Sequence, residues 1–200
     1  MPHLPLDIAA LGADLIAVSA ATFGGPTVAA VAARPGLLLE LESDVDLPVP
    51  QRFEWGPLPI ELLDGLTAAV DHLAGLDERA TGTRRARLIT SLSAAGDYER
   101  VLSEHLDAGL RTLPGVTVLG TATDRLPFAA FTVARHTPHQ VGDFLQRRGV
   151  SVWTGPSGMT QLMRALGVDE MGGASYLGLM PHTTFGEVDQ FVASLAELTA

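Results

Sequence analysis

The chain has 200 residues, a formal net charge of −10, an apolar fraction of 46 %, no cysteine, and only arginine among its 13 Lys+Arg positions. This length suits one domain or one and a half small ones, with enough apolar residues for a packed core. The acidic balance argues against nucleic-acid binding, which needs a basic face, and the absence of cysteine excludes disulfides, thiolate nucleophiles and cysteine-ligated metals.

The amino-terminal part is predicted to hold a short helix at 4–11 and two short strands at 15–19 and 27–32. Both strands are apolar and brief, as buried strands are, and Gly24-Gly25-Pro26 forms the turn between them. These segments are typical of the end of a sheet whose other strands lie elsewhere. Their unpaired edges would favour association with another chain.

The middle of the chain is predicted to be helical. A brief helix at 37–41 is followed by a proline-rich stretch, 44–59, that should be an extended connection. A helix at 60–76 comes next, because its apolar residues recur with the helical period. A long helix of about 84–113 then ends at Pro114-Gly115.

From Gly115 onward strands and helices alternate. Strands are predicted at 116–119, 128–134, 150–154 and 174–179, and helices at 138–148, 157–166 and 184–198. Thr137 is a plausible N-cap of the first of these helices, and Thr183 or Thr184 caps the last, with Glu187 completing a capping box. This order predicts a small α+β domain with a mainly antiparallel sheet.

The chain has no pattern of a signal peptide or a membrane span. Its start lacks a basic region followed by an apolar run, and apolar runs elsewhere are broken by glycine, proline or charge. We therefore expect a cytoplasmic protein without membrane contact.

A series of short motifs in a fixed order covers nearly the whole chain. The motifs are Leu11-Gly12-Ala13-Asp14, Ser19 to Pro26, Arg52 to Gly56, Leu66 to Leu73, Leu113 to Val116, Gly149 to Gly155 and Glu187 to Asp189. Together they resemble class V aminotransferases, and most of all the cysteine desulfurase-like branch of these pyridoxal phosphate (PLP) enzymes.

The resemblance implies the C-terminal half of a PLP-transferase fold. Residues 1–59 would be a remnant of the large cofactor domain with its connecting segment, and residues 60–200 the small domain with its long linking helices. The missing upstream half would hold most of the cofactor-binding residues. Trp55 would then lie at a subunit contact if the family dimer is kept.

The resemblance also places departures at the chemical positions. Thr22 stands where the family has the lysine that forms a Schiff base with PLP, and arginine cannot supply that primary amine. Pro57 stands where a threonine commonly binds phosphate, and Tyr176 where an arginine normally grips the substrate carboxylate. Ser19 remains as a weak candidate for cofactor binding, while Thr22 is better interpreted as a turn residue than as a nucleophile.

Further candidates for a substrate pocket are Trp153, Tyr176 and His182. The alternative for Trp153 is a strand-end aromatic residue, and for Tyr176 ordinary sheet packing. His136 and His139 flank Pro138, but no third ligand of suitable type is evident, so we predict no metal site.

Losing the lysine, the carboxylate-binding arginine and the phosphate-binding threonine together predicts a pseudoenzyme that is inactive by itself and does not bind PLP covalently. It would act as a homo-dimer or a hetero-complex. An alternative is a subunit of a split PLP-dependent enzyme, completed by a separately encoded N-terminal half. A gene fragment without a selected function is the third possibility.

Overall fold

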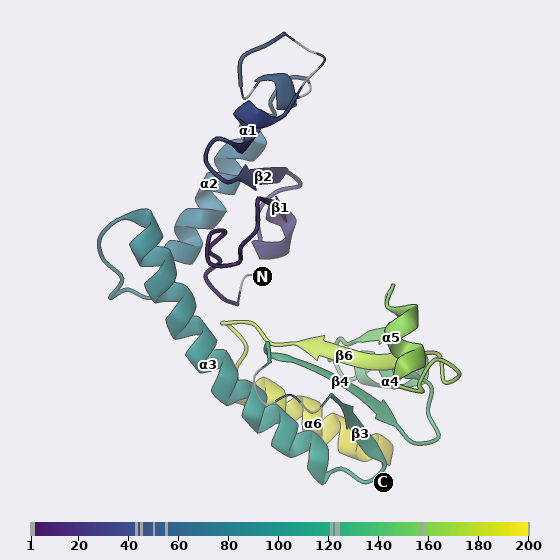
Figure 1. Cartoon of the computed structure of the whole chain (residues 1–200). Helices are drawn as coiled ribbons and strands as arrows, with labels where there is room; N and C mark the ends of the chain where they lie inside the picture. Colours follow the sequence, from purple (N-terminus) through teal and green to yellow (C-terminus); the bar gives the residue numbers. More distant parts are fainter. Residues whose placement is uncertain are drawn as a thin grey trace. The chain divides into compact units, whose positions relative to one another are not determined.

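The computed structural model describes residues 3–42, 44, 46–49, 51–54, 56–120, 122, 125–156 and 158–199 (Figure 1). Trp55 lies outside the described residues. The chain divides into two compact units, residues 1–95 and 96–200, and each is described by itself. The predicted division into 1–59 and 60–200 rests on the family resemblance and stays a prediction.

The first unit contains a small sheet of two antiparallel strands. The strand predicted at 15–19 is confirmed as β1, Leu15–Ser19, and the strand predicted at 27–32 is present with shifted bounds as β2, Ala29–Ala33. The two pair from Leu15 opposite Ala33 to Ser19 opposite Ala29. The remaining elements are the 3-10 turns η1 (Ala20–Phe23) and η2 (Gln51–Phe53) and the helices α1 (Leu37–Glu40) and α2 (Ile60–Ala74). The β1–β2 turn touches α2, since a Cβ added at Gly65 would lie 3.2 Å from the Pro26 ring.

The helix predicted at 4–11 is wrong. Residues 8–12 form hydrogen-bonded turns instead, and Gly12 adopts the left-handed conformation with φ 66°. The cause is Asp7, whose carboxylate accepts hydrogen bonds from the backbone N–H groups of Ala9 at 2.9 Å and Ala10 at 3.1 Å. A short polar side chain that binds its neighbouring backbone favours a turn over a helix.

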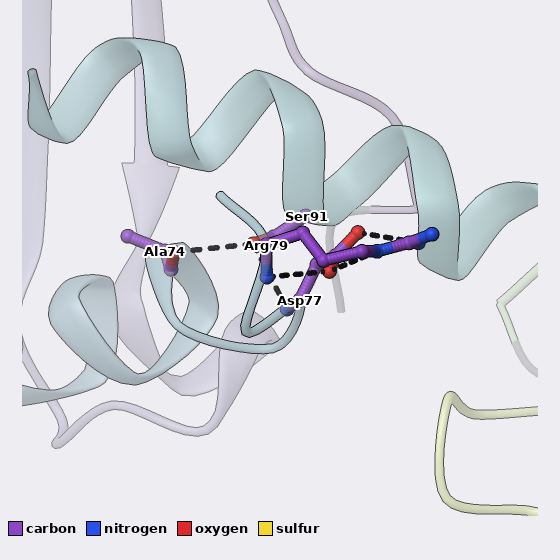
Figure 2. A network of polar contacts seen from close by, with 4 residues as sticks. All are labelled: Ala74, Asp77, Arg79 and Ser91. Atoms are coloured by element: carbon purple, nitrogen blue, oxygen red, sulfur yellow. Dashed lines mark hydrogen bonds and ion pairs between the residues drawn. The ribbon is translucent and has the colours of Figure 1, made fainter. Parts of the chain in front are cut away.

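A polar network holds the connection between α2 and the long helix α3, Arg84–Thr112 (Figure 2). The Ser91 hydroxyl on α3 donates to the carbonyl of Ala74 at 3.1 Å and accepts from the backbone N–H of Asp77 at 3.1 Å. The Asp77 carboxylate in turn accepts from the backbone and the guanidinium of Arg79. These hydrogen bonds from Arg79 hold the pKa of Asp77 below its usual range. The last carbonyls of α2, which have no partner within the helix, are thus partly satisfied by α3.

The second unit is an antiparallel sheet covered by helices. Its strands are β3 (Val116–Leu119), β4 (Phe128–Val133), β5 (Trp153–Gly155) and β6 (Ala174–Gly178), in the order β3-β4-β6-β5. The helices are α4 (Pro138–Gln146), α5 (Thr160–Ala165) and α6 (Phe185–Thr199). All three strand pairs are antiparallel, which confirms the predicted α+β architecture.

The main core of this unit lies on one face of its sheet. Leu102, Leu106 and Leu110 of α3 are buried there with Phe131 of β4 and Leu195 of α6. A smaller apolar cluster contains Met163 of α5, Ala174 of β6, and Val168 from the segment between them. No helix in the described part of the chain is long and apolar enough to cross a membrane.

Two predicted boundaries shift at β5 and α5. The strand predicted at 150–154 begins only at Trp153, because the N–H of Val150 donates to the carbonyl of Leu145 at 3.1 Å and closes the end of α4. The helix predicted at 157–166 spans Thr160–Ala165, and Ser157 lies outside the described residues.

The predicted helix caps are both present. The Thr137 hydroxyl accepts from the N–H of Gln140 at 3.3 Å, and the Gln140 side chain accepts from the N–H of Thr137 at 2.9 Å. At α6 the Thr184 hydroxyl accepts from the N–H of Glu187 at 3.2 Å, while Glu187 accepts from the N–H of Thr184 at 2.7 Å. These reciprocal bonds satisfy backbone donors that a helix start leaves open.

We expect Thr137→Ala to lower the free energy of unfolding by about 1 kcal/mol, because it removes one half of the capping box. The measurement is urea unfolding followed by circular dichroism. Thr160→Ala is the matched control, since the exposed Thr160 is the first residue of α5 and that helix has no side-chain cap. An equal loss in both variants would contradict a stabilising role for the cap.

Candidate functional site

The segment from Ser19 to Gly25 forms a tight turn at the end of β1. The N–H of Ala20 donates to the carbonyl of Val28 at 2.8 Å, and the N–H of Gly25 donates to the carbonyl of Ala20 at 2.9 Å. Ala20 is buried, and a Cβ at Gly25 would lie 2.9 Å from the Ala20 side chain. The sequence therefore needs a small residue at both places to close this turn.

Thr22 and Ser19 lie in this turn with exposed side chains. The Thr22 hydroxyl donates to the Ser19 carbonyl at 2.6 Å, so it is engaged by the local backbone. The Ser19 side chain precedes η1 but makes no cap hydrogen bond to it. Ser19 thus offers an exposed hydroxyl, whereas Thr22 uses its hydroxyl to hold the turn.

Trp153 and Tyr176 are brought together in the second unit. They lie directly opposite each other on β5 and β6, so their side chains share one face of the sheet. Phe128 of β4 lies on the same face, with its ring centroid 5.8 Å from that of Tyr176. These rings form a row of aromatic side chains across β4, β6 and β5.

The members of this aromatic row differ sharply in burial. Trp153 is 71 % exposed and Phe128 43 %, whereas Tyr176 is only 5 % exposed. The Tyr176 hydroxyl is buried and has no hydrogen-bond partner among the described residues, and the same holds for the Ser175 hydroxyl. A buried polar group without a partner costs about 1–3 kcal/mol.

His182 lies in the exposed turn between β6 and α6, not in the aromatic row. The turn is held by the N–H of Thr183, which donates to the carbonyl of Met180 at 2.9 Å. The pKa of Glu187 lies below its usual range, chiefly because the N–H and the hydroxyl of Thr184 donate to its carboxylate. The positive charge that His182 can carry lowers this pKa further. His182 therefore acts electrostatically on the first turn of α6 and lies apart from Trp153 and Tyr176.

The sequence did not reveal a cavity of about 310 Å³ beside α3, which is lined by three arginines, Arg100, Arg111 and Arg125. Asp107 lies in it and forms ion pairs of 2.6 Å with both Arg111 and Arg125. Partial burial raises the pKa of Asp107, but hydrogen bonds from the two guanidinium groups outweigh it and keep this pKa below its usual range. Asp107 and Arg111 lie four residues apart on α3, a spacing that predicts an ion pair. Arg125 lies outside this helix, and no local pattern predicts its ion pair with Asp107.

The described residues include no group of three or more histidine, aspartate or glutamate side chains that could hold a metal ion. The two histidines near Pro138 have separate contacts. His136 Nδ1 lies 3.0 Å from the carbonyl of Ala134, and His139 Nε2 lies 3.8 Å from the carboxylate of Asp143.

Comparison of the sequence with known proteins finds class-V aminotransferases and cysteine desulfurases. The family model of class-V aminotransferases matches residues 1–191. An uncharacterized protein of Mycobacterium tuberculosis is 34 % identical over 201 residues, which are 98 % of this chain and 50 % of that protein. A cysteine desulfurase of Salmonella newport is 30 % identical over 213 residues, covering 98 % of this chain and 48 % of the enzyme.

Comparison of structures also finds a cysteine desulfurase with a similar fold. The crystal structure of the cysteine desulfurase CsdA from Escherichia coli superimposes with a TM-score of 0.78 at 22 % identity, covering 99 % of this chain and 50 % of that one. The chain therefore spans about half the length of the relatives it matches, and its structure resembles half of a cysteine desulfurase PLP-transferase fold.

We expect Tyr176→Phe to leave the free energy of unfolding unchanged or to raise it, because the variant removes a buried hydroxyl that has no partner among the described residues. Tyr98→Phe is the matched comparison in the same unit, since the Tyr98 hydroxyl donates to the carbonyl of Thr183 at 2.6 Å. Its loss should cost about 1 kcal/mol. Urea unfolding of both variants checks this, and a clear loss in Tyr176→Phe would show that its hydroxyl has a partner.

Proposed function

The chain belongs to the class V aminotransferase family, and we propose that by itself it is a catalytically silent half of a cysteine desulfurase-like fold. Members of this family depend on PLP. On this proposal the chain does not bind PLP covalently, and it acts as a homo-dimer or in a hetero-complex with a family member.

The observation that carries the proposal is the state of Thr22. By its resemblance to the family, Thr22 occupies the position of the Schiff-base lysine. Its hydroxyl donates a hydrogen bond to the Ser19 carbonyl at 2.6 Å. None of the 13 basic residues is a lysine, so the chain has no side-chain primary amine for a Schiff base. The residues of this segment therefore do not fit covalent attachment of PLP.

The aromatic row supports the same proposal. A guanidinium binds a carboxylate through two parallel charge-assisted hydrogen bonds. Tyr176 would offer a single neutral hydroxyl at the position where the resemblance expects that guanidinium, and this hydroxyl is buried. Trp153, which is 71 % exposed, adds apolar surface and no charge. A site of this composition is poorly suited to hold an amino-acid substrate by its carboxylate.

A second candidate function is a subunit of a split PLP-dependent enzyme. It is favoured by one observation, namely that the chain aligns over 98 % of its length with 50 % of a relative. A partner polypeptide would then supply the residues of the other half. Such a partner would also have to bring a lysine from a position unrelated to Thr22.

We expect neither the wild-type chain nor Thr22→Lys to show stoichiometric PLP binding or release of sulfide or pyruvate from cysteine. The reason is that one restored amine leaves Tyr176 and Pro57 unchanged, and catalytic residues that act as a unit are not rescued singly. The measurement is an absorbance titration with PLP, followed by turnover assays.

Thr27→Lys is the matched control for this experiment. It places a lysine on another exposed threonine of the same loop, so it measures unspecific reaction of PLP with an added amine. A stoichiometric visible band in Thr22→Lys but not in Thr27→Lys, with turnover above that of free PLP, would overturn the proposal of a silent site.

A further inference from the structure

Polar residues recur at helical spacing along the second half of α3. Their intervals of three or four residues place them on one side of the helix, and they are Arg100, Ser103, Glu104, Asp107 and Arg111. Such a run of charges is usually a helix face in water. Here, however, all of these residues line one cavity of about 310 Å³ in the second unit.

A second part of the chain closes this cavity. Arg125 and Ala122, from the segment between β3 and β4, form its other wall. The side chains of Arg125 and Asp107 are only 23 % and 21 % exposed, and Ser103 is buried. The charges are therefore partly shielded from water, which makes their interactions with a ligand stronger than on an open surface.

The charges that line the cavity do not cancel. The Glu104 carboxylate accepts from Arg100 at 2.9 Å and balances that arginine. The Asp107 carboxylate is shared by Arg111 and Arg125, each at 2.6 Å. Because one carboxylate serves two guanidinium groups, the cavity keeps an excess positive charge, although the net charge of the chain is −10.

The two guanidinium groups around Asp107 also keep unused donors. Arg111 binds this carboxylate through Nε and Nη2, and Arg125 binds it through Nη2. Within the described part of the chain, Nη1 of Arg111 and both Nε and Nη1 of Arg125 have no hydrogen-bond partner. Asp107 thus holds two arginines from separate parts of the chain side by side, with N–H groups left over for a further acceptor.

We infer that this cavity binds a phosphate group, either as free phosphate or as the phosphate of a small ester. Guanidinium groups bind phosphate through charge-assisted hydrogen bonds, and the Ser103 hydroxyl can add another donor. A phosphate group presents oxygens in several directions and can accept from Arg111, Arg125 and Ser103 together, whereas a carboxylate presents two oxygens in one plane.

The size of the cavity and the charge of the chain narrow the class of ligand. A volume of about 310 Å³ lies at the lower end of the range for small-molecule sites, so a small phosphate ester fits. A nucleic acid is disfavoured, because the strongly negative chain would repel its many phosphates. None of the described lining residues is one that the family resemblance assigns to cofactor or substrate, so the inference does not rest on the proposed function.

The experiment is calorimetric titration of the full chain at fixed ionic strength with inorganic phosphate, glycerol 3-phosphate and succinate. We expect saturable one-to-one binding of the first two, and binding of succinate at least about tenfold weaker, because succinate spreads its charge over two distant carboxylates. Tighter binding of glycerol 3-phosphate than of phosphate identifies an ester as the ligand, and the reverse order identifies the free ion.

Two variants should change the affinity for phosphate in opposite directions. Arg111→Gln removes a donor and a charge, and we expect it to weaken binding at least about tenfold. Asp107→Asn keeps an acceptor oxygen for the arginines but removes the competing negative charge, so it should tighten binding at least about threefold.

Arg164→Gln is the matched control. Arg164 lies on α5 in the same unit, is 71 % exposed, and also forms an ion pair, with Asp169 at 3.6 Å. Its removal should leave the affinity for phosphate unchanged. Circular dichroism checks that each variant is folded.

Absence of saturable phosphate binding up to about 10 mM would overturn the inference. Binding of succinate as tight as that of phosphate would overturn it too, and so would equal affinities in Arg111→Gln and Arg164→Gln. If Arg111→Gln does not fold, Asp107→Asn decides. A purely structural ion-pair cluster predicts no tighter binding in that variant, and this result would also refute the site.

Discussion

The constraint on which this structure depends is that an apolar sheet must be covered. In the second unit the requirement is met on the main face, because α3, α4 and α6 place Leu102, Val141 and Leu195 against Phe131. In the first unit the same requirement is not met for β1 and β2, whose apolar side chains remain exposed. Burial of apolar area is the dominant favourable contribution to folding, and it is concentrated in the core of the second unit rather than around β1 and β2.

The sequence predicted the elements whose signals are local. The N-cap at Thr137 and the capping box at the start of the last helix could be predicted, because each depends on residues only three or four positions apart in sequence. The strands were readable from short apolar runs, and the family resemblance was readable from motifs in order. The fold class therefore followed from the sequence, since each local signal agreed with the others.

What the sequence could not give depends on residues that meet through the fold. The burial of the Tyr176 hydroxyl follows from its neighbours on β4 and β5, and the pair of Asp107 with Arg125 joins a helix to a distant loop. The turn at Asp7 was missed because its capping bonds compete with a weak helical pattern. Such competition is decided by small differences in free energy that a pattern of residue types does not contain.

The hydrogen bond of Thr22 connects the stability of the fold with the loss of chemistry that we propose. A lysine in an exposed turn contributes little to local structure, whereas the threonine hydroxyl donates to the Ser19 carbonyl and helps to close the turn. Catalytic positions are often kept at a cost in stability, and that cost disappears when catalysis is no longer required. A residue that satisfies the backbone is then the expected replacement.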